Sequence, residues 1–468
     1  MPAHPAGPRH GDIVDPHPAP DAPAVAGSLD PAVWPQSATR ADNGALHVGG
    51  MDVRDIVAEC GTPAVIYDEQ HVRDAARAYA EAYSSQGADC DVYYAGKAFL
   101  TTRIARWIAD EGVRLDVCTG GELEIALRAG VDPARLLFHG NNKSEAEIQA
   151  ALSAGVGRFV VDSFTEIARL GQLATEQGVT TGVLVRVTVG VEAHTHEYIA
   201  TAHEDQKFGL GLSDGNAAEA AHRVATMPNL ELLGLHSHIG SQIFDPAGFE
   251  VAARRLVELA AKLAAEGITI GELNLGGGMG IAYLPGDDPL AVADMAKQIV
   301  AAVRAECEQS GQPMPRLAVE PGRAIVGTAG ITLYTVGTIK RIELDAGGSR
   351  TYVSVDGGMS DNIRTALYDA EYTAVLANRE SASEPELCRI VGKHCESGDI
   401  VVRDVWLPGD IATGDLIAVA ATGAYCRAMA SNYNAVPRPP AMGVRDGRLS
   451  TLLRRETVVD MLALDPGL

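Results

Sequence analysis

The sequence predicts an α/β protein: a (β/α)8 TIM barrel followed by a second, mostly β domain that forms a β-barrel or sandwich. From about residue 65 to 335, short apolar runs rich in β-forming residues alternate with Ala-, Leu- and Glu-rich stretches of helical composition. Beyond about residue 335 the helical stretches stop while the strand-like runs continue. The chain has 468 residues, more than one ordinary hydrophobic core accommodates, so two domains are expected.

Apolar runs that match the strands of a barrel recur over a span close to the roughly 250 residues typical of this fold. In chain order, with the polar or glycine residue near each end, they are VYYAGK (Lys97), VRLDVC (Asp116), RLLFHG (His139), RFVVDS (Asp162), VLVRVTV (Arg186), LLGLHSH (His238), LNLGGG (Gly276) and LAVEPGR (Glu320). Glycines follow the seventh run and EPGR closes the eighth, where barrels commonly bind phosphate. A doubly wound open sheet usually carries its glycine-rich turn after the first strand. The barrel is therefore favoured.

The domain boundaries follow from changes in composition. We expect a barrel over residues 65–335, a β domain over 336–468 to which residues 45–64 contribute, and a disordered Pro/Ala-rich tail over 1–44. The β domain is indicated by TYVSVDGG, CRIVGKHC, DIVVRDVWLP and GDLIAVAATGAY, and it ends in a short helix, ETVVDMLAL. The wide polar gap VEAHTHEYIATAHEDQKFG, residues 191–209, is predicted to be an inserted active-site loop.

The charge balance and the cysteine pattern exclude several classes of protein. With 38 basic against 61 acidic residues, the formal net charge is −23, which argues against a nucleic-acid or anionic-membrane partner. The seven cysteines are scattered without zinc-like spacing, so we expect no metal site and a reducing, cytoplasmic environment. No apolar stretch approaches the roughly 20 residues that span a bilayer.

Lys97 ends the first run, in the segment YAGKA. A lysine there is costly unless it is paired, exposed or covalently used, and a strand-end lysine that reaches solvent is the ordinary alternative. A lysine that forms a Schiff base with pyridoxal 5'-phosphate needs two further features, a phosphate cradle and a charged partner for the pyridine nitrogen. Two later segments offer both.

The glycine run Gly276, Gly277 and Gly278 lets the backbone approach an anion and is expected to expose N–H groups as a phosphate nest. Ser241, in HSHIGS, is a further candidate donor to the phosphate. Glu320 is the candidate partner of the pyridine nitrogen, because a carboxylate there keeps that nitrogen protonated. The alternative for Glu320 is an ion pair with Arg323 or Arg186.

Further candidate site residues are supported only in combination with the motifs above. His238 is the candidate for stacking on the cofactor ring, while His236 is expected to be structural. In HCESGD, Cys395 beside Glu396 is a candidate proton donor, against the alternative of a buried structural cysteine. Tyr425 lies in a predicted turn in GAYCRAM. In IRTALYD, Arg364 and Tyr368 are spaced to face one pocket from a helical turn.

Together YAGKA, HSHIGSQ, LGGGMG, EPGR, CESGD and ATGAYCRAM resemble the pyridoxal phosphate-dependent decarboxylases of the alanine racemase-like fold (fold type III), from about residue 45 to the C-terminus. Within that group the chain is most similar to the diaminopimelate decarboxylases. The resemblance implies that Lys97 forms the Schiff base, that His238 stacks on the ring, and that Cys395 protonates the carbanion left by carbon dioxide. It implies cofactor binding by Ser241, Gly276, Gly277, Gly278, Glu320, Pro321, Gly322, Arg323 and Tyr425, and substrate binding by Arg323, Arg364, Tyr368, Glu396 and Tyr425.

The same resemblance implies decarboxylation of meso-2,6-diaminopimelate to L-lysine, the last step of bacterial lysine synthesis. It also implies a homodimer whose CESGD loop completes the partner's active site. The alternatives are a decarboxylase of arginine, ornithine or carboxynorspermidine on the same scaffold, or a non-catalytic pyridoxal phosphate-binding protein. A racemase is disfavoured because that branch predicts an arginine in place of Glu320. One departure is Gly-Lys-His before Cys395, where the resemblance predicts a proline.

Overall fold

The computed structural model describes residues 27–191, 207–343 and 349–467. The chain divides into two compact units. Of the described residues, those within 73–280 and 288–325 form the barrel unit, and those within 27–72, 281–287 and 326–467 form the β unit. The active-site loop predicted over 191–209 lies outside the described residues, apart from Val191 and residues 207–209.

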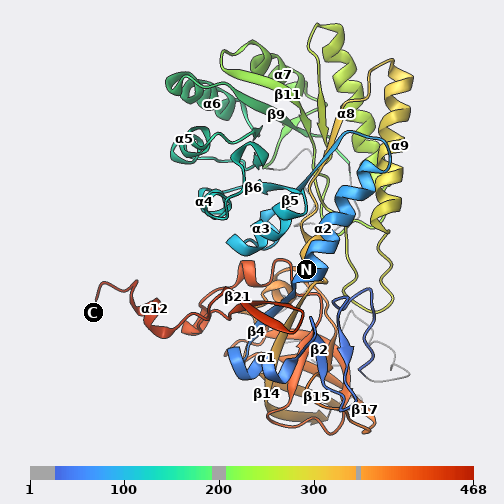
Figure 1. Ribbon diagram of the computed structural model, residues 1–468, viewed down its shortest axis with the longest axis vertical. Coiled ribbons are helices and arrows are strands. Elements are labelled where there is room, and N and C mark those ends of the chain that lie inside the picture. Colours follow the sequence, from blue (N-terminus) through green and yellow to red (C-terminus); the bar gives the residue numbers. More distant parts are fainter. Residues whose placement is uncertain (1–26, 192–206, 344–348, 468) are drawn as a thin grey trace. The chain divides into compact units, whose positions relative to one another are not determined.

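The barrel unit contains a closed parallel barrel, which confirms the predicted fold class (Figure 1). Its strands in sheet order are β9 (Thr181–Thr188), β11 (Leu230–His236), β12 (Glu272–Asn274), β13 (Arg316–Val319), β5 (Cys90–Ala95), β6 (Arg114–Val117), β7 (Leu136–Phe138) and β8 (Arg158–Val161). Pairing of β8 with β9 closes the ring, and a short strand, β10 (Leu210–Gly211), adds to the side of β9. Each predicted run overlaps one of the barrel strands.

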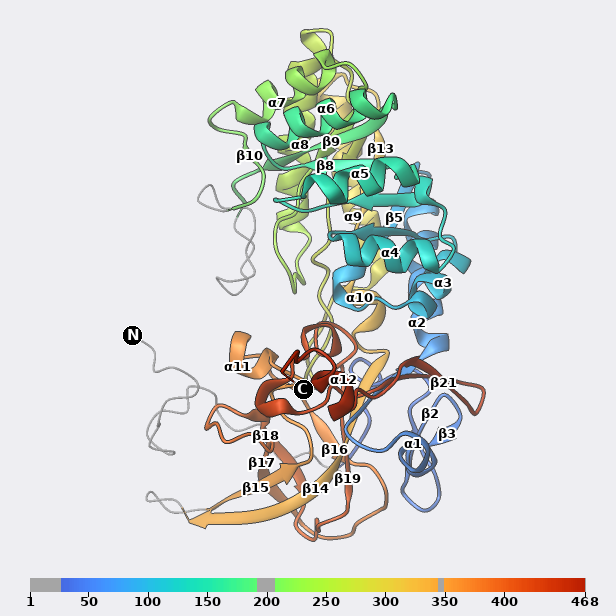
Figure 2. The same cartoon turned by 90° about the vertical axis from the view of Figure 1, so that its left-hand side faces the viewer.

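Helices cover the outside of this barrel (Figure 2). They are α2 (Glu69–Ser84), α3 (Thr102–Asp110), α4 (Gly120–Arg128), α5 (Glu145–Ala154), α6 (Phe164–Gln177), α7 (Asn216–Thr226), α8 (Ala247–Ala265) and α9 (Val292–Ser310). The short α10 (Arg323–Val326) follows β13. Helices α3 to α6 each begin at a Ser or Thr cap whose side chain accepts a backbone N–H of the first turn, namely Thr101, Thr119, Ser144 and Ser163. Because each cap follows its strand within a few residues, the polar residues between strand and helix gather at one rim of the barrel.

The barrel interior is filled with side chains. Tyr93, Leu137, Val160, Leu184 and Ala318, from five different strands, form one buried cluster. Such layers make the interior a packed core rather than a pore. Chemistry is thereby confined to the rim where the strands end.

The β unit is built on a sheet with the order β18-β17-β15-β14-β4-β20-β21, and β19 pairs with both β14 and β16. These strands are β4 (Ala64–Asp68), β14 (Gly330–Glu343), β15 (Ser349–Val355), β16 (Ala374–Leu376), β17 (Pro385–Val391), β18 (Ile400–Pro408), β19 (Leu416–Val419), β20 (Ala441–Arg445) and β21 (Arg448–Leu453). Helices α11 (Arg364–Tyr368) and α12 (Val458–Leu462) complete the C-terminal part. Strand β4, which precedes the barrel in the chain, pairs with β14 and β20. The hairpin of β20 and β21 has no counterpart in the sequence-based expectation.

The segment before β4 differs in part from the expected disordered tail over 1–44. Residues 1–26 lie outside the described residues, but residues 27–44 are folded and include β1 (Thr39–Arg40). Beyond them lie β2 (Leu46–Val48), β3 (Met51–Asp52) and α1 (Val53–Cys60). Trp34 is only 1% exposed, and the apolar surface that its ring buries stabilises a fold that the Pro/Ala-rich composition does not reveal. Within the described part of the chain, no helix is both long and apolar enough to cross a membrane.

Candidate active site

Lys97 lies in a single turn of 3-10 helix, Gly96–Ala98, directly after β5. The Tyr94 hydroxyl donates a hydrogen bond to the Phe99 carbonyl at 2.5 Å and so closes this turn. Only glycine fits at position 96, because a Cβ there would lie 2.9 Å from the carbonyl oxygen of Asp116. The backbone of the turn is thus fixed, while the Lys97 side chain is exposed.

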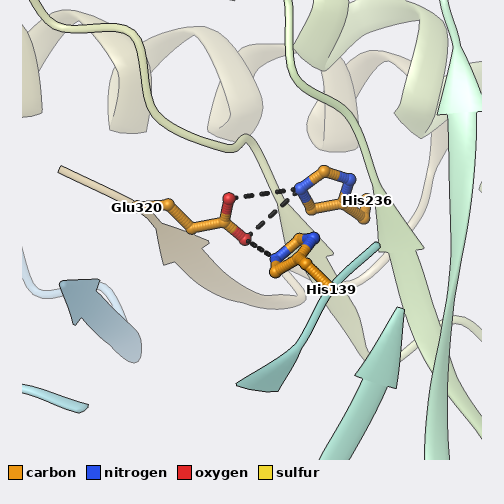
Figure 3. A group of neighbouring side chains, drawn as sticks. All are labelled: His139, His236 and Glu320. Carbon is orange, nitrogen blue, oxygen red and sulfur yellow. Dashed lines mark hydrogen bonds and ion pairs between the residues drawn. The ribbon is translucent and has the colours of Figure 1, made fainter. Parts of the chain in front are cut away.

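Glu320 follows β13 and accepts hydrogen bonds from residues at the ends of three other strands. Two of these residues, His139 and His236, are drawn with Glu320 in Figure 3. Its Oε1 lies 2.8 Å from His139 Nε2 and 2.8 Å from Asn274 Nδ2. His236 Nε2 lies 3.4 Å from Oε2 and 3.3 Å from Oε1. The carboxylate is 5% exposed, and these contacts replace the water that it loses.

The surroundings of Glu320 keep it ionised. Burial alone raises the pKa of this carboxyl, but the adjacent His139 and His236 rings outweigh burial and hold the pKa well below its usual range. Burial lowers the pKa of His236 to about 4, so His236 is neutral at pH 7 and donates to Glu320 from Nε2. Glu320 is therefore a fixed negative charge at the rim.

His139, His236 and Glu320 also form a ligand set of the kind that binds metals, with atoms within 4.8 Å of one another. The ring nitrogens that face Glu320 already form hydrogen bonds with it, and the Asn274 amide supplies a further donor. Hydrogen bonding accounts for the geometry without an ion. The cluster is better described as the support of one carboxylate.

Electrostatic effects connect Lys97 to this cluster. Burial raises the pKa of Asp116 to about 6, against the opposing effects of His139 and Lys97. Burial and then the positive charge of Lys97 hold the pKa of His238 well below its usual value. An amine at position 97 therefore lies within electrostatic range of both an acid and a neutral imidazole.

The glycine segment is close-packed and differs from the expected nest. Gly276 and Gly278 have positive φ angles of 68° and 111°, and a Cβ on Gly277 would fall 2.2 Å from the Glu320 carbonyl oxygen. The N–H of Gly276 donates to Asn274 Oδ1 at 2.9 Å, and that of Gly277 donates to His238 Nδ1 at 3.2 Å. Two of the three expected phosphate donors are thus used inside the protein, whereas Gly278 is partly exposed.

The EPGR segment packs against the Lys97 turn. The Ala95 N–H donates to the Pro321 carbonyl at 3.1 Å, and a Cβ on Gly322 would lie 2.9 Å from the Ala95 Cβ. Arg323 Nη2 donates to Ser241 Oγ at 3.0 Å. The structure therefore brings the first, sixth and eighth barrel strands together around the residues that the sequence singled out.

In the β unit, Arg364 is 7% exposed and lies among aromatic rings. Its Nη1 donates to the Tyr283 hydroxyl at 2.9 Å and to the Tyr372 hydroxyl. The guanidinium lies 5.0 Å from the centroid of the Tyr283 ring, a cation–π distance. Within the described ranges, Arg364 forms no ion pair with a carboxylate. A buried cation of this kind is suited to binding an anionic ligand.

The HCESGD loop is held by Asp399. Its carboxylate accepts the N–H of His394 at 2.8 Å and that of Met359 at 2.6 Å. The His394 ring, next to Lys393 where the resemblance predicts a proline, lies 2.8 Å from Ser360 Oγ. The loop is anchored on both sides, and the Cys395 side chain that it carries is exposed.

The remaining predicted residues of the β unit are Glu396, Tyr368 and Tyr425, each partly exposed. Tyr368 is the last residue of α11. Tyr425 has a φ of +64°, a left-handed conformation that is uncommon outside glycine and is concentrated at functional sites.

The predicted residues therefore fall into two sets. Lys97, His238, Ser241, Gly276, Gly277, Gly278, Glu320, Pro321, Gly322 and Arg323 belong to the barrel unit, and Arg364, Tyr368, Cys395, Glu396 and Tyr425 belong to the β unit. Sequence reasoning did not assign site roles to five residues that contact these sets: Asp116, His139, Asn274, Tyr283 and Tyr372. Asp116 and His139 carried a signal, a polar side chain at a strand end. Asn274 sits between two leucines, and no pattern marks either tyrosine.

Comparison with known proteins adds an independent finding. Residues 69–327 match the family model of the pyridoxal-dependent decarboxylases, pyridoxal binding domain. A curated diaminopimelate decarboxylase of Mycobacterium tuberculosis is 53% identical over 442 residues, which cover 93% of this chain and 98% of the relative. That of Mycobacterium leprae is 51% identical over 473 residues, covering 99% and 100%. The crystal structure of diaminopimelate decarboxylase from M. jannaschii in co-complex with L-lysine has a TM-score of 0.85 at 33% identity, covering 92% of this chain and 97% of that one.

Proposed function

The chain belongs to the pyridoxal-dependent decarboxylases, and we propose that it converts meso-2,6-diaminopimelate to L-lysine and carbon dioxide, the last step of bacterial lysine synthesis. The observation that carries this proposal is the 53% identity to a diaminopimelate decarboxylase over nearly the full length of both chains. The ionised Glu320 agrees with it, because decarboxylation needs a strong electron sink and an anion at the pyridine nitrogen strengthens that sink.

The residues at the barrel rim fit pyridoxal 5'-phosphate. When bound, this cofactor supplies the electron sink for the carbanion that forms as carbon dioxide leaves. The exposed Lys97 amine would hold its aldehyde, Glu320 its pyridine nitrogen and His238 its ring face. Ser241 and the close-packed glycine segment would hold its phosphate. The chain's own contribution is to fix these groups before the substrate arrives.

Arg364 is the proposed anchor of the substrate's distal carboxylate. Its planar guanidinium can bind a carboxylate through two parallel hydrogen bonds, and it donates to the Tyr283 and Tyr372 hydroxyls. Arg323 and Tyr368 are proposed to hold the same carboxylate, and Glu396 and Tyr425 to contact the substrate or the cofactor. Lysine or ornithine would leave the arginine without an anion, which is the physical basis for rejecting them.

Cys395 is proposed to donate the proton that replaces the lost carboxylate, since its side chain is exposed on an anchored loop. We propose a homodimer in which this loop completes the partner's site, with the barrel unit holding the cofactor and the β unit completing the active site. A cytoplasmic location is supported by the seven free cysteines.

The direct test is carbon dioxide release from a panel of substrates: meso-diaminopimelate, lysine, arginine, ornithine and carboxynorspermidine. We expect strong preference for meso-diaminopimelate and, with the cofactor bound, a yellow protein. Preference for another amino acid of the panel would show that the chain is a decarboxylase of different substrate specificity. Cofactor binding with no gas release from any substrate would indicate a non-catalytic protein.

The shared site has its own test. Lys97→Ala and Cys395→Ser variants are each expected to be nearly inactive. If the loop completes the partner's site, a heterodimer of the two variants has one site with both changes and one site with neither. When the two variants are mixed in equal amounts and re-associated, about half of the dimers are heterodimers. The mixture should therefore regain about one quarter of wild-type activity. No recovery from a mixture that demonstrably contains heterodimers would place Cys395 in the same subunit's site.

A further inference from the structure

We propose that Asn274 is a positioning residue that couples the pyridine-nitrogen end of the cofactor site to its phosphate end. This inference rests on the proposed function, because it concerns how the same rim holds pyridoxal 5'-phosphate. Asn274 is the last residue of β12 and is 0% exposed. Its side-chain amide contacts Glu320 and Gly276, so its assigned role is to position these two residues.

Both ends of the Asn274 amide are used. Nδ2 donates to Glu320 Oε1 at 2.8 Å, and Oδ1 accepts the N–H of Gly276 at 2.9 Å. The partners fix which end is which, since a backbone N–H can only donate and a carboxylate can only accept. One buried side chain therefore bridges the carboxylate after β13 and the glycine turn after β12.

The contacts of Glu320 are unequal between its two oxygens. Oε1 has two donors at 2.8 Å, His139 and Asn274. Oε2 has a longer contact of 3.4 Å, from His236. Because Oε1 is held firmly from two sides, Oε2 is the oxygen best able to accept a further, stronger hydrogen bond. Asn274 would thereby help to leave Oε2 available for the pyridine nitrogen when the cofactor is bound.

At the other end, Asn274 sets the start of the glycine turn. Gly276 has a φ of +68° and is packed so closely that a Cβ would lie 2.5 Å from the Ser237 carbonyl oxygen. Its buried N–H would be unsatisfied without the Asn274 oxygen, which is costly. The Asn274 side-chain amide therefore supports both the glycine turn that leads to Gly278 and the Glu320 carboxylate. A change at Asn274 should loosen the phosphate end and the pyridine end of the site together.

The test compares two ligands that differ only in the phosphate. Cofactor-free protein is titrated with pyridoxal 5'-phosphate and with pyridoxal, and each Kd is followed by absorbance. The ratio of the two Kd values measures what the phosphate contributes. For Asn274→Ala we expect the Kd for pyridoxal 5'-phosphate to rise about tenfold or more. We also expect the ratio to move toward one, since both ends are loosened.

Two further variants separate the ends. Asn274→Asp keeps an acceptor for the Gly276 N–H but turns a second carboxylate oxygen toward Glu320 Oε1, so both affinities should fall while the ratio stays near the wild-type value. Glu320→Gln keeps an amide oxygen that can accept the hydrogen bond from Asn274 Nδ2. It therefore weakens the pyridine end alone and should give the same pattern. Asn216→Asp is the matched control, because Asn216 also donates to a carboxylate, Asp214, but does so on an exposed part of the barrel unit. It should change neither affinity.

Wild-type affinities in Asn274→Ala, or an unchanged ratio despite weaker binding, would overturn the coupling. Thermal unfolding of each cofactor-free variant identifies one that has lost its fold. If Asn274→Ala does so, Asn274→Asp carries the test, and unchanged affinities there would overturn the proposal. Failure of the proposed function looks different: the wild-type protein itself would then bind no cofactor or release no carbon dioxide.

Discussion

Glu320 in the barrel unit and Arg364 in the β unit are both buried charges of the predicted site, and the protein satisfies them in opposite ways. In the barrel unit, Glu320 is surrounded by donors from His139, His236 and Asn274, so its negative charge is supported within the protein. In the β unit, Arg364 contacts two tyrosine hydroxyls and two aromatic rings, with no carboxylate among the described residues to neutralise it.

This difference separates two kinds of binding. A charge that is already satisfied costs little reorganisation and is suited to a resident cofactor. A buried charge without a counter-ion gains most when a ligand supplies one, which suits a substrate that comes and goes. We therefore expect changes in the barrel unit to act on the cofactor, and changes in the β unit to act on the substrate and its proton.

The largest expected effect is that of Lys97→Ala in the barrel unit. Loss of the amine should lower kcat at least about a thousandfold and remove the visible absorbance of the bound cofactor. Lys262→Ala, an exposed lysine on α8, is the control and should change neither. Carbon dioxide release and an absorbance scan provide the measurement, and a variant that stays yellow and active would break the assignment of cofactor chemistry to this residue.

In the β unit, Cys395→Ser should lower kcat by about 10²–10⁴-fold, the usual contribution of a general acid. The cofactor absorbance should remain, which sharpens the contrast with Lys97. Cys60→Ser, a partly exposed cysteine at the end of α1, is the matched control. Equal loss of activity and of cofactor occupancy would show that Cys395 supports the structure instead.

Arg364→Ala should raise KM for meso-diaminopimelate by about 30-fold or more, since truncating one partner of a buried charged hydrogen bond costs roughly 2 kcal/mol or above. Arg364→Lys retains the charge but not the planar fork, so it should recover only part of the loss. Arg454→Ala removes an exposed arginine of the same unit, paired with Asp460, and should leave KM unchanged. A normal KM in Arg364→Ala would rule out its role as the carboxylate anchor.

The smallest expected effect is on stability, through His236. Its pKa falls from 6.5 to about 4 on burial, so below pH 6.5 the unfolded chain binds a proton that the folded barrel does not. The free energy of unfolding therefore decreases by roughly 2–3 kcal/mol as the pH falls from 6.5 toward 4. Urea unfolding at pH 7.5 and at pH 4.5 measures this decrease, which should be smaller in His236→Gln. The exposed His222→Gln should retain it, and identical pH profiles for all three proteins would contradict the buried neutral imidazole.

The sequence anticipated the scaffold better than the site. Alternating apolar runs located each barrel strand, because the period of a strand and the composition of a helix are local properties. Glycine positions were also anticipated, but not their use, since the N–H groups of Gly276 and Gly277 bond to Asn274 and His238. Burial of Trp34, in the segment that was expected to be disordered, was likewise not predictable from the local sequence.

By itself, the chain's sequence determined that a barrel and a β unit form and that a lysine, a glycine turn and a glutamate occupy strand ends at the rim, because these features depend on short-range pattern and residue chemistry. Only the tertiary structure decided which donors reach Glu320. His139 and Glu320 are 181 positions apart in the chain, yet His139 Nε2 lies 2.8 Å from Glu320 Oε1. A hydrogen bond depends on tenths of an ångström between strands, and that distance is set by the closed sheet and its packing.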